Sequence, residues 1–153
     1  MKVYTHHFKQ FVPASLDETW HFFASPLNLQ KITPVFMKFV VTSDFQEHQQ
    51  MYQAMLISYK VSPIFNIPLS WVTEITAIEE KKYFIDEQRF GPFKLWHHEH
   101  HFKAVDSGVM MEDRLSYALP LGVLGNIAHA LSVKNKVREI FKYREEAIHK
   151  LFS

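Results

Sequence analysis

Hydrophobic and polar residues alternate along most of the chain, and this period-two pattern predicts β-strands. The strands expected from it cover residues 1–12, 37–42, 51–61, 69–78, 82–90, 93–105 and 109–119. Short polar or Gly- and Pro-containing segments separate most of them, so consecutive strands should pair antiparallel.

The pattern changes to a helical period after residues 120–125. One apolar stripe comprises Ile127, Ala130, Val133, Val137, Ile140, Phe141, Ile148, Leu151 and Phe152. It predicts one long amphipathic helix, or two helices with a break near Ser132. Arg144 lies on the same stripe, so its charged end must either extend to water or be paired.

Two short helices are expected after the first strand. Ser15 and Glu18 have the spacing of a capping box at the start of a helix. Ser25 and Pro26 open a second helix that ends near residues 33–34. The order of elements predicts a single α+β domain over residues 1–153, in which the sheet curls around the final helix and leaves space beneath it.

Residues 97–101 read His-His-Glu-His-His, and strand geometry divides them between two faces. One face carries Trp96, His98, His100, Phe102 and Ala104. The other carries Leu95, His97, Glu99, His101 and Lys103. Because the first face is apolar apart from its two histidines, we expect it to point inward and the second to face water.

The next strand has an inward face of the same kind, which carries one carboxylate. This face comprises Met111, Asp113, Leu115, Tyr117 and Leu119. A hairpin loop at 107–108 or 106–109 would place the first inward histidine opposite Tyr117 and the second opposite Leu115. Asp113 would then lie diagonal to the second histidine, within side-chain reach.

Neighbouring strands extend this polar patch. Trp71, Thr73 and Ile75 share an inward face, and Phe84, Asp86, Gln88 and Phe90 share another. The candidate ligand-binding residues are Trp71, Phe84, Asp86, Gln88, Trp96, His98, His100, Asp113 and Tyr117.

Four interpretations of the inward histidines remain open. His98 and His100 are core residues satisfied by Asp113 and Tyr117, or they are a polar patch that contacts a ligand. A His-x-His pair can also chelate zinc with Asp113, but no further inward His or Glu is firmly placed, so no metal site is expected. A histidine held by Asp113 can act as a general base. Since no nucleophile accompanies them, His98, His100 and Asp113 are catalytic candidates only.

Composition narrows the classes of protein. Aromatic residues make up 15% of the 153 positions, which indicates a bulky core or a lined apolar cavity. Lys and Arg (17) nearly balance Asp and Glu (16), which argues against a nucleic-acid partner. Without cysteine, disulfides and thiolate sites are excluded. No apolar run or signal peptide indicates stable membrane insertion or export, so we expect a cytoplasmic protein.

Several segments resemble, in order, the START-like or birch-allergen-like (SRPBCC) superfamily, whose fold is called the helix-grip. More narrowly, the chain is similar to an uncharacterised bacterial branch of ligand-binding members. The matching segments are 27–34, Trp71 with Glu74 and Ile75, 84–88, 91–93, 96–102, 112–117, 119–122 and 140–144.

The resemblance implies a seven-stranded curved antiparallel sheet, two short helices and a long C-terminal helix that closes an internal cavity. Relatives bind lipids, sterols, polyketides, quinones or aromatic metabolites. We therefore expect a carrier or sensor of a hydrophobic small molecule, without a cofactor. The alternatives are a cyclase- or dehydratase-type enzyme that uses a cavity histidine as general acid or base, and a module with a filled cavity that binds partners through its surface.

Overall fold

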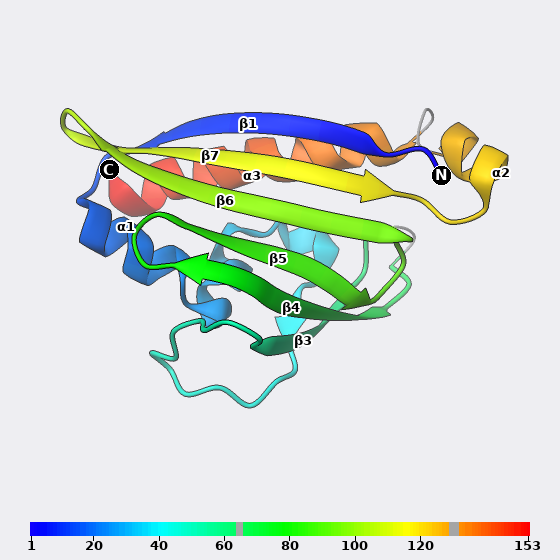
Figure 1. Cartoon of the computed structure of the whole chain (residues 1–153), viewed down its shortest axis with the longest axis horizontal. Coiled ribbons are helices and arrows are strands. Elements are labelled where there is room, and N and C mark those ends of the chain that lie inside the picture. Colours follow the sequence, from blue (N-terminus) through cyan, green and yellow to red (C-terminus); the bar gives the residue numbers. More distant parts are fainter. Residues whose placement is uncertain (64–65, 129–131) are drawn as a thin grey trace.

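The computed structural model describes residues 1–63, 66–128 and 132–153, and within them seven strands form one antiparallel sheet (Figure 1). The sheet order is β1-β7-β6-β5-β4-β3-β2. The strands are β1 Tyr4–Val12, β2 Val40–Val41, β3 Leu56–Val61, β4 Leu69–Glu79, β5 Tyr83–Phe90, β6 Leu95–Val105 and β7 Gly108–Ala118. The helices are α1 Leu16–Phe23, η1 Pro26–Ile32, η2 Val35–Met37, α2 Gly122–Ala128 and α3 Lys134–Phe152, where η denotes a 3₁₀-helix.

The sheet curves around α3, as expected. Figure 1 shows α3 running behind β1, β7 and β6, while α1 and the 3₁₀ segments lie beside the opposite half of the sheet. Pairing between β4 and β5 shifts register twice, between Val72 and Thr73 and between Ile75 and Ala77. Such bulges bend a strand and increase its twist, which helps the sheet to wrap.

The predicted capping box is confirmed. The Glu18 backbone N–H donates to Ser15 Oγ at 3.2 Å, and the Ser15 backbone N–H donates to Glu18 Oε2 at 3.0 Å. These bonds satisfy backbone donors that the first turn of α1 would otherwise leave free. The helix thereby starts at a fixed position and buries Trp20 and Phe23 against the sheet.

Alternation along β6 and β7 also follows the prediction. His98, His100 and Phe102 are buried on the face that meets α3, and so are Asp113 and Tyr117 from β7. The histidines and the carboxylate therefore lie on the concave side of the sheet.

The predicted register of this hairpin is wrong by two residues along β7. His100 lies opposite Asp113 and His98 opposite Leu115, because the two-residue loop consists of Asp106 and Ser107.

Ser107, although not a glycine, takes the left-handed conformation (φ 66°) in this turn. Gly108 is instead the first residue of β7, where an added Cβ would lie 2.4 Å from the Val12 carbonyl oxygen and 2.6 Å from the Phe11 ring. The glycine serves a close approach of two strands, not the turn.

Two expected strands are shorter than predicted. Only Val40–Val41 of 37–42 pairs, since Lys38 adopts a left-handed conformation (φ 47°) after η2. Residues 51–55 form a turn before β3, with Ala54 at φ 69°. Positive φ values at these residues interrupt the extended backbone that their side chains suggested.

The C-terminal stripe is buried where α3 crosses the sheet, at Val137, Phe141, Arg144 and Ile148. The other predicted members differ: Ile127 and Leu151 are about half exposed, at 52% and 48%. Residues 129–131 lie outside the described part of the chain. The predicted burial of Ala130 and the expected break near Ser132 fall on or beside these residues. No helix of the described residues is long and apolar enough to cross a membrane.

Candidate functional site

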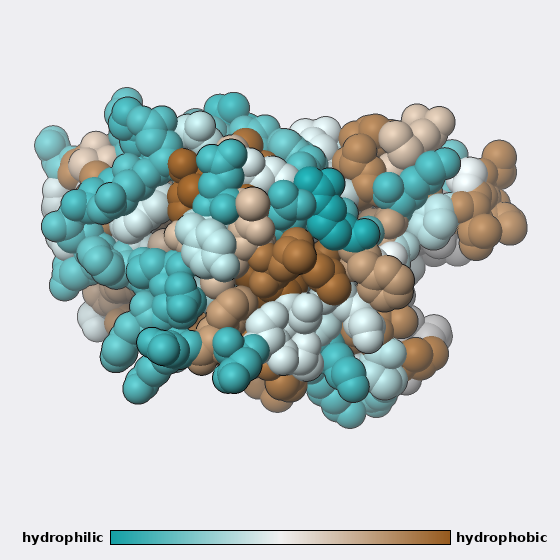
Figure 2. Space-filling model, turned by 60° about the horizontal axis from the view of Figure 1, so that its bottom comes forward, coloured by the Kyte–Doolittle hydropathy of each residue, from teal (hydrophilic) through white to brown (hydrophobic). Residues whose placement is uncertain are grey.

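A cavity of about 390 Å³ lies between the concave sheet and α3. This volume is within the range of small-molecule sites. Its lining comes mainly from apolar side chains of the η1 region, β3 and β4, the loops at the ends of these strands, and α3. Figure 2 shows hydrophobic residues gathered in a hollow on one face of the molecule, bordered by hydrophilic ones.

Aromatic rings form one wall of the cavity. The Trp71 ring packs edge-on against Trp96, with centroids 5.1 Å apart, and contacts Phe93 at 5.5 Å and Tyr59 at 5.7 Å. Thr73 anchors two of these rings, since its Oγ1 accepts a hydrogen bond from Trp71 Nε1 at 3.1 Å and lies 3.0 Å from the Tyr59 hydroxyl. The wall therefore offers flat apolar surfaces held in fixed orientations.

The polar end of the cavity consists of Asp86, His98 and His100. His100 Nε2 is bonded to Asp86 Oδ2 at 2.7 Å, and His98 Nδ1 lies 3.5 Å from the same oxygen. The two imidazole centroids are only 3.8 Å apart, because strand geometry places residues i and i+2 on the same face.

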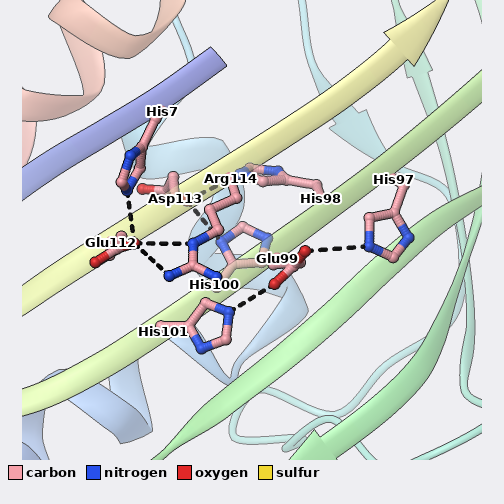
Figure 3. A network of polar contacts seen from close by, with 9 residues as sticks. All are labelled: His7, His97, His98, Glu99, His100, His101, Glu112, Asp113 and Arg114. Atoms are coloured by element: carbon pink, nitrogen blue, oxygen red, sulfur yellow. Dashed lines mark hydrogen bonds and ion pairs between the residues drawn. The ribbon is translucent and has the colours of Figure 1, made fainter. Parts of the chain in front are cut away.

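Asp113 contacts both histidines from the neighbouring strand β7 and does not line the cavity. Its Oδ1 accepts a hydrogen bond from His98 Nε2 at 2.9 Å and lies 2.9 Å from His100 Nδ1 (Figure 3). The Arg144 guanidinium approaches the same oxygen at 3.8 Å and lies over the Phe141 ring. The predicted pairing of Arg144 is therefore met by a carboxylate from the sheet.

Two buried polar atoms at this end make no hydrogen bond within the described part of the chain. They are His100 Nδ1, which is close to Asp113 but not aligned with it, and Arg144 Nε. Other polar groups of the lining are bonded locally, for example Asn28 to the Phe22 carbonyl and Thr33 to the Leu29 carbonyl. The unsatisfied hydrogen-bonding capacity of the cavity is therefore concentrated at one end.

The two carboxylates remain ionised despite their burial. Desolvation raises the pKa of Asp113, but hydrogen bonds and the charges of His100 and His98 outweigh it and hold that pKa far below its ordinary value. The pKa of Asp86 is lowered for the same reason, chiefly by its bond to His100 and also by the charge of Arg144.

The two histidines differ in protonation although they share the same partners. Desolvation, together with the nearby charge of His100, lowers the pKa of His98. Desolvation also acts on His100, but the close Asp113 and Asp86 carboxylates outweigh it and raise the pKa of His100. These opposite shifts favour the charged form of His100 beside Asp86 and Asp113, and the neutral form of His98.

The remaining residues of the His-His-Glu-His-His segment form a separate group on the opposite face of β6. Glu99 accepts a hydrogen bond from His101 at 2.8 Å and lies 3.5 Å from His97, which also bonds Glu87 at 2.9 Å (Figure 3). These side chains are about one-third exposed, so the sequence interpretation of a solvated face applies to them.

Six of the nine candidate ligand-binding residues line the cavity. They are Trp71, Phe84, Asp86, Trp96, His98 and His100. Asp113 contacts both histidines from β7, and Tyr117 is fully buried against Tyr4 and Trp96. Whether these residues bind a ligand stays a prediction.

Gln88 does not line the cavity but fixes the loop before β6. Its side-chain amide donates to the Phe93 carbonyl at 2.6 Å and accepts from the Phe93 backbone N–H at 3.1 Å. Phe93 itself lines the cavity, so Gln88 acts on the cavity wall indirectly.

Sequence reasoning missed Tyr59 and Arg144 as cavity residues. Tyr59 shares a face with Ile57 and Val61, so period-two alternation could have identified it. Arg144 was recognised as anomalous on the apolar stripe, but its partner lies on a strand 31 positions earlier and no local pattern reveals it.

Comparison with known proteins supports the fold independently. No protein-family model matches the chain, and no curated protein matches it significantly. Solved structures do match over nearly the whole length. Protein CV1439 from Chromobacterium violaceum superposes with a TM-score of 0.71 at 12% identity, covering 97% of this chain and 96% of that one.

Two further solved structures match the chain and identify the group of proteins that shares its fold. Ara h 8.0201 has a TM-score of 0.63 at 15% identity, covering 97% of this chain and 99% of that one. A START superfamily protein from Mycobacterium smegmatis has a TM-score of 0.67 at 14% identity, covering 97% and 98%. At such identities the likeness establishes architecture alone. The chain therefore has the helix-grip fold of the START and birch-allergen-like (SRPBCC) proteins.

Proposed function

We propose that this protein binds one hydrophobic small molecule in its internal cavity, as a carrier or sensor. The observation that supports this most is the cavity of about 390 Å³ with polar side chains concentrated at one end. Burial of apolar ligand surface contributes about 25 cal/mol per Å², so the aromatic wall supplies the driving force. Such a site suits a lipid, quinone, polyketide or aromatic metabolite. We also propose that the protein acts in the cytoplasm.

The polar end would determine the orientation of the ligand. Arg144 lines the cavity, and its Nε is buried without a hydrogen bond, so a polar ligand group would satisfy this donor. The bound molecule should therefore carry one polar or anionic group on a mainly apolar frame, with that group directed toward His98, His100 and Asp86.

Ligand binding can be tested on the purified protein. Organic extracts would be examined by mass spectrometry, and thermal unfolding would be followed with a set of fatty acids, quinones and aromatic acids. A ligand present at 100 times its Kd should stabilise the protein by about 2.7 kcal/mol. Empty extracts together with no shift from any compound would contradict the proposal.

A matched pair of variants makes the test specific to the cavity. Ile140 lines the cavity from α3, whereas Leu151 lies on the same helix, is half exposed and does not line it. Ile140→Trp should fill the cavity and abolish ligand-induced stabilisation, while Leu151→Trp should leave it intact. Equal effects of the two substitutions would place binding elsewhere.

A cyclase- or dehydratase-type activity is the second candidate, favoured by one contact. His98 is held by Asp113 at 2.9 Å while facing the cavity, which is the arrangement of an oriented general base. Incubation with β-hydroxy carbonyl and polyketide compounds would reveal turnover by mass spectrometry. His98→Asn should then abolish turnover and preserve thermal stability; loss of stability with unchanged turnover would make His98 structural.

A further inference from the structure

The polar end of the cavity has the side chains and spacing of a divalent-metal site. Asp86 Oδ2 lies 2.7 Å from His100 Nε2 and 3.5 Å from His98 Nδ1, and one ligand atom from each residue lies within 4.8 Å of the others. Metal–ligand bonds of about 2.0–2.2 Å separate neighbouring ligand atoms by roughly 3–3.5 Å. We propose that Asp86, His98 and His100 bind one divalent transition-metal ion, Zn²⁺ or Fe²⁺.

Asp113 gives both histidines the orientation that such a site requires. Its Oδ1 lies 2.9 Å from His98 Nε2 and 2.9 Å from His100 Nδ1, so each ring directs one nitrogen toward Asp113 and the other toward Asp86. A carboxylate that accepts the second N–H of a metal-binding histidine fixes its tautomer. Here one carboxylate is positioned to serve two histidines.

The contacts within the protein serve the two inward nitrogens unequally. His100 Nε2 lies 2.7 Å from Asp86 Oδ2, whereas His98 Nδ1 lies 3.5 Å from the same oxygen, although both rings are buried. One added proton can complete the contacts of one ring only. A metal ion bound to both inward-facing nitrogens would serve both rings and leave each remaining N–H to Asp113, so the ion accounts for more of the geometry.

The charges around the site also accommodate a dication. Two buried carboxylates, Asp86 and Asp113, face one permanent cation, Arg144. With neutral histidines and a bound dication, one net positive charge remains. The three ligand residues supply two nitrogens and one oxygen, a set that suits Zn²⁺ or Fe²⁺, and they lie on the cavity wall, where further coordination positions would be accessible.

If the cavity binds a small molecule, as proposed above, the net positive charge of the metal-loaded site determines which ligands fit. A ligand with a single anionic oxygen donor, such as a carboxylate or a phenolate, would both coordinate the ion and neutralise the site. An apolar molecule without such a group would gain nothing from the metal.

Metal binding can be measured without any organic ligand. The purified 153-residue chain, treated with a chelator, would be titrated with ZnCl₂ by calorimetry and with CoCl₂ by visible absorption. We expect one ion per chain. His98→Gln, His100→Gln or Asp86→Asn should weaken binding by more than ~100-fold, and Asp113→Asn by about 10- to 100-fold with the stoichiometry unchanged.

The same strand provides a matched control. His97 and His101 flank residues 98–100 in the sequence, but they face solvent with Glu99. The double variant His97→Gln/His101→Gln should therefore still bind one metal ion tightly. Loss of tight binding in that variant, or binding by Asp86→Asn as tight as by the unaltered chain, would overturn the proposal. So would the absence of one-to-one binding by the unaltered chain, a result that needs no variant to fold.

The metal and the ligand can be separated experimentally. Ile140→Trp should still bind Zn²⁺, because Ile140 belongs to the apolar part of the lining, even where it no longer binds an organic molecule. Zinc binding without ligand binding would contradict the carrier proposal alone, and ligand binding without zinc binding would contradict the metal site alone.

Discussion

Arg144 of α3 lies 3.8 Å from Asp113 of β7, and this contact joins the C-terminal helix to the centre of the sheet. Both side chains are buried, with exposures of 8% and 2%. The guanidinium also lies 5.0 Å from the centre of the Phe141 ring. A buried ion pair of this kind stabilises the fold less through attraction than through the cost of leaving either partner alone.

Replacement of Arg144 by methionine should therefore be strongly destabilising. The substitution keeps much of the apolar volume but leaves Asp113 without its permanent counter-charge. We expect a loss of about 3 kcal/mol in the free energy of unfolding, measured by urea denaturation. Arg138→Met, on the exposed side of the same helix, should change it by no more than about 0.5 kcal/mol. Equal losses would show that the ion pair contributes nothing specific.

The aromatic wall depends on a single hydroxyl. Thr73 Oγ1 accepts from Trp71 Nε1 and contacts the Tyr59 hydroxyl, so Thr73→Val removes the partner of a buried N–H while keeping the side-chain shape. We expect a loss of about 1–3 kcal/mol in the free energy of unfolding. Thr76→Val, at a half-buried position of the same strand, is the control and should cost less. An unchanged stability of Thr73→Val would mean that the wall is held by packing alone.

Local periodicity in the sequence predicted the architecture and the faces of the strands. Alternation placed His98, His100 and Asp113 on the concave side, and the capping box placed the start of α1. These features depend on residues within a few positions of one another, which is the range over which sequence patterns carry information.

Features that depend on distant residues could not be predicted in the same way. Loops at 106–107 and 107–108 both preserve the inward faces, so patterning alone could not choose between them. The choice depends on Gly108, which lies against Phe11 and Val12 of β1. The two faces of β5 have similar polarity, so the contact of Asp86 with the two histidines emerges only from the pairing of β5 with β6.

Tyr117 should make stability depend on pH in the alkaline range. Burial, with a smaller contribution from Tyr4, raises the pKa of Tyr117 from 10.0 to about 12. The folded state therefore favours the neutral phenol, while the unfolded chain ionises from pH 10 upward. The stabilising contribution is complete below pH 10 and is lost as the pH rises toward 12.

Comparison with Tyr117→Phe isolates this effect from the other groups that titrate in the same range. Between pH 10 and 12 the unaltered protein should lose about 1–2 kcal/mol more than the variant in urea unfolding. Among the described residues, Tyr4 and His6 of β1 are titratable groups close to Tyr117, and both are unaltered in the variant. Identical pH profiles for the two proteins would contradict the assignment.

Gln88 should affect ligand binding from outside the cavity. Its side chain makes two hydrogen bonds to the backbone of Phe93, a cavity residue whose ring packs on Trp71 and Trp96. Gln88→Met should release this loop at a cost of about 1–2 kcal/mol in the free energy of unfolding. Because the Phe93 ring would lose its fixed position, the thermal stabilisation by any cavity ligand should also fall.

A second substitution reaches the same loop from the other side. A Cβ at Gly91 would lie 2.5 Å from Gln88 Oε1, so Gly91→Ala must displace the Gln88 side chain and should reproduce both effects. Gln53→Met, at an exposed position before β3, should produce neither. The contrary outcome is a Gln88→Met variant that is less stable but is stabilised by ligand as much as the Gln53→Met control. In that case the position of Phe93 has no influence on the ligand, and Phe93 is not part of the binding wall.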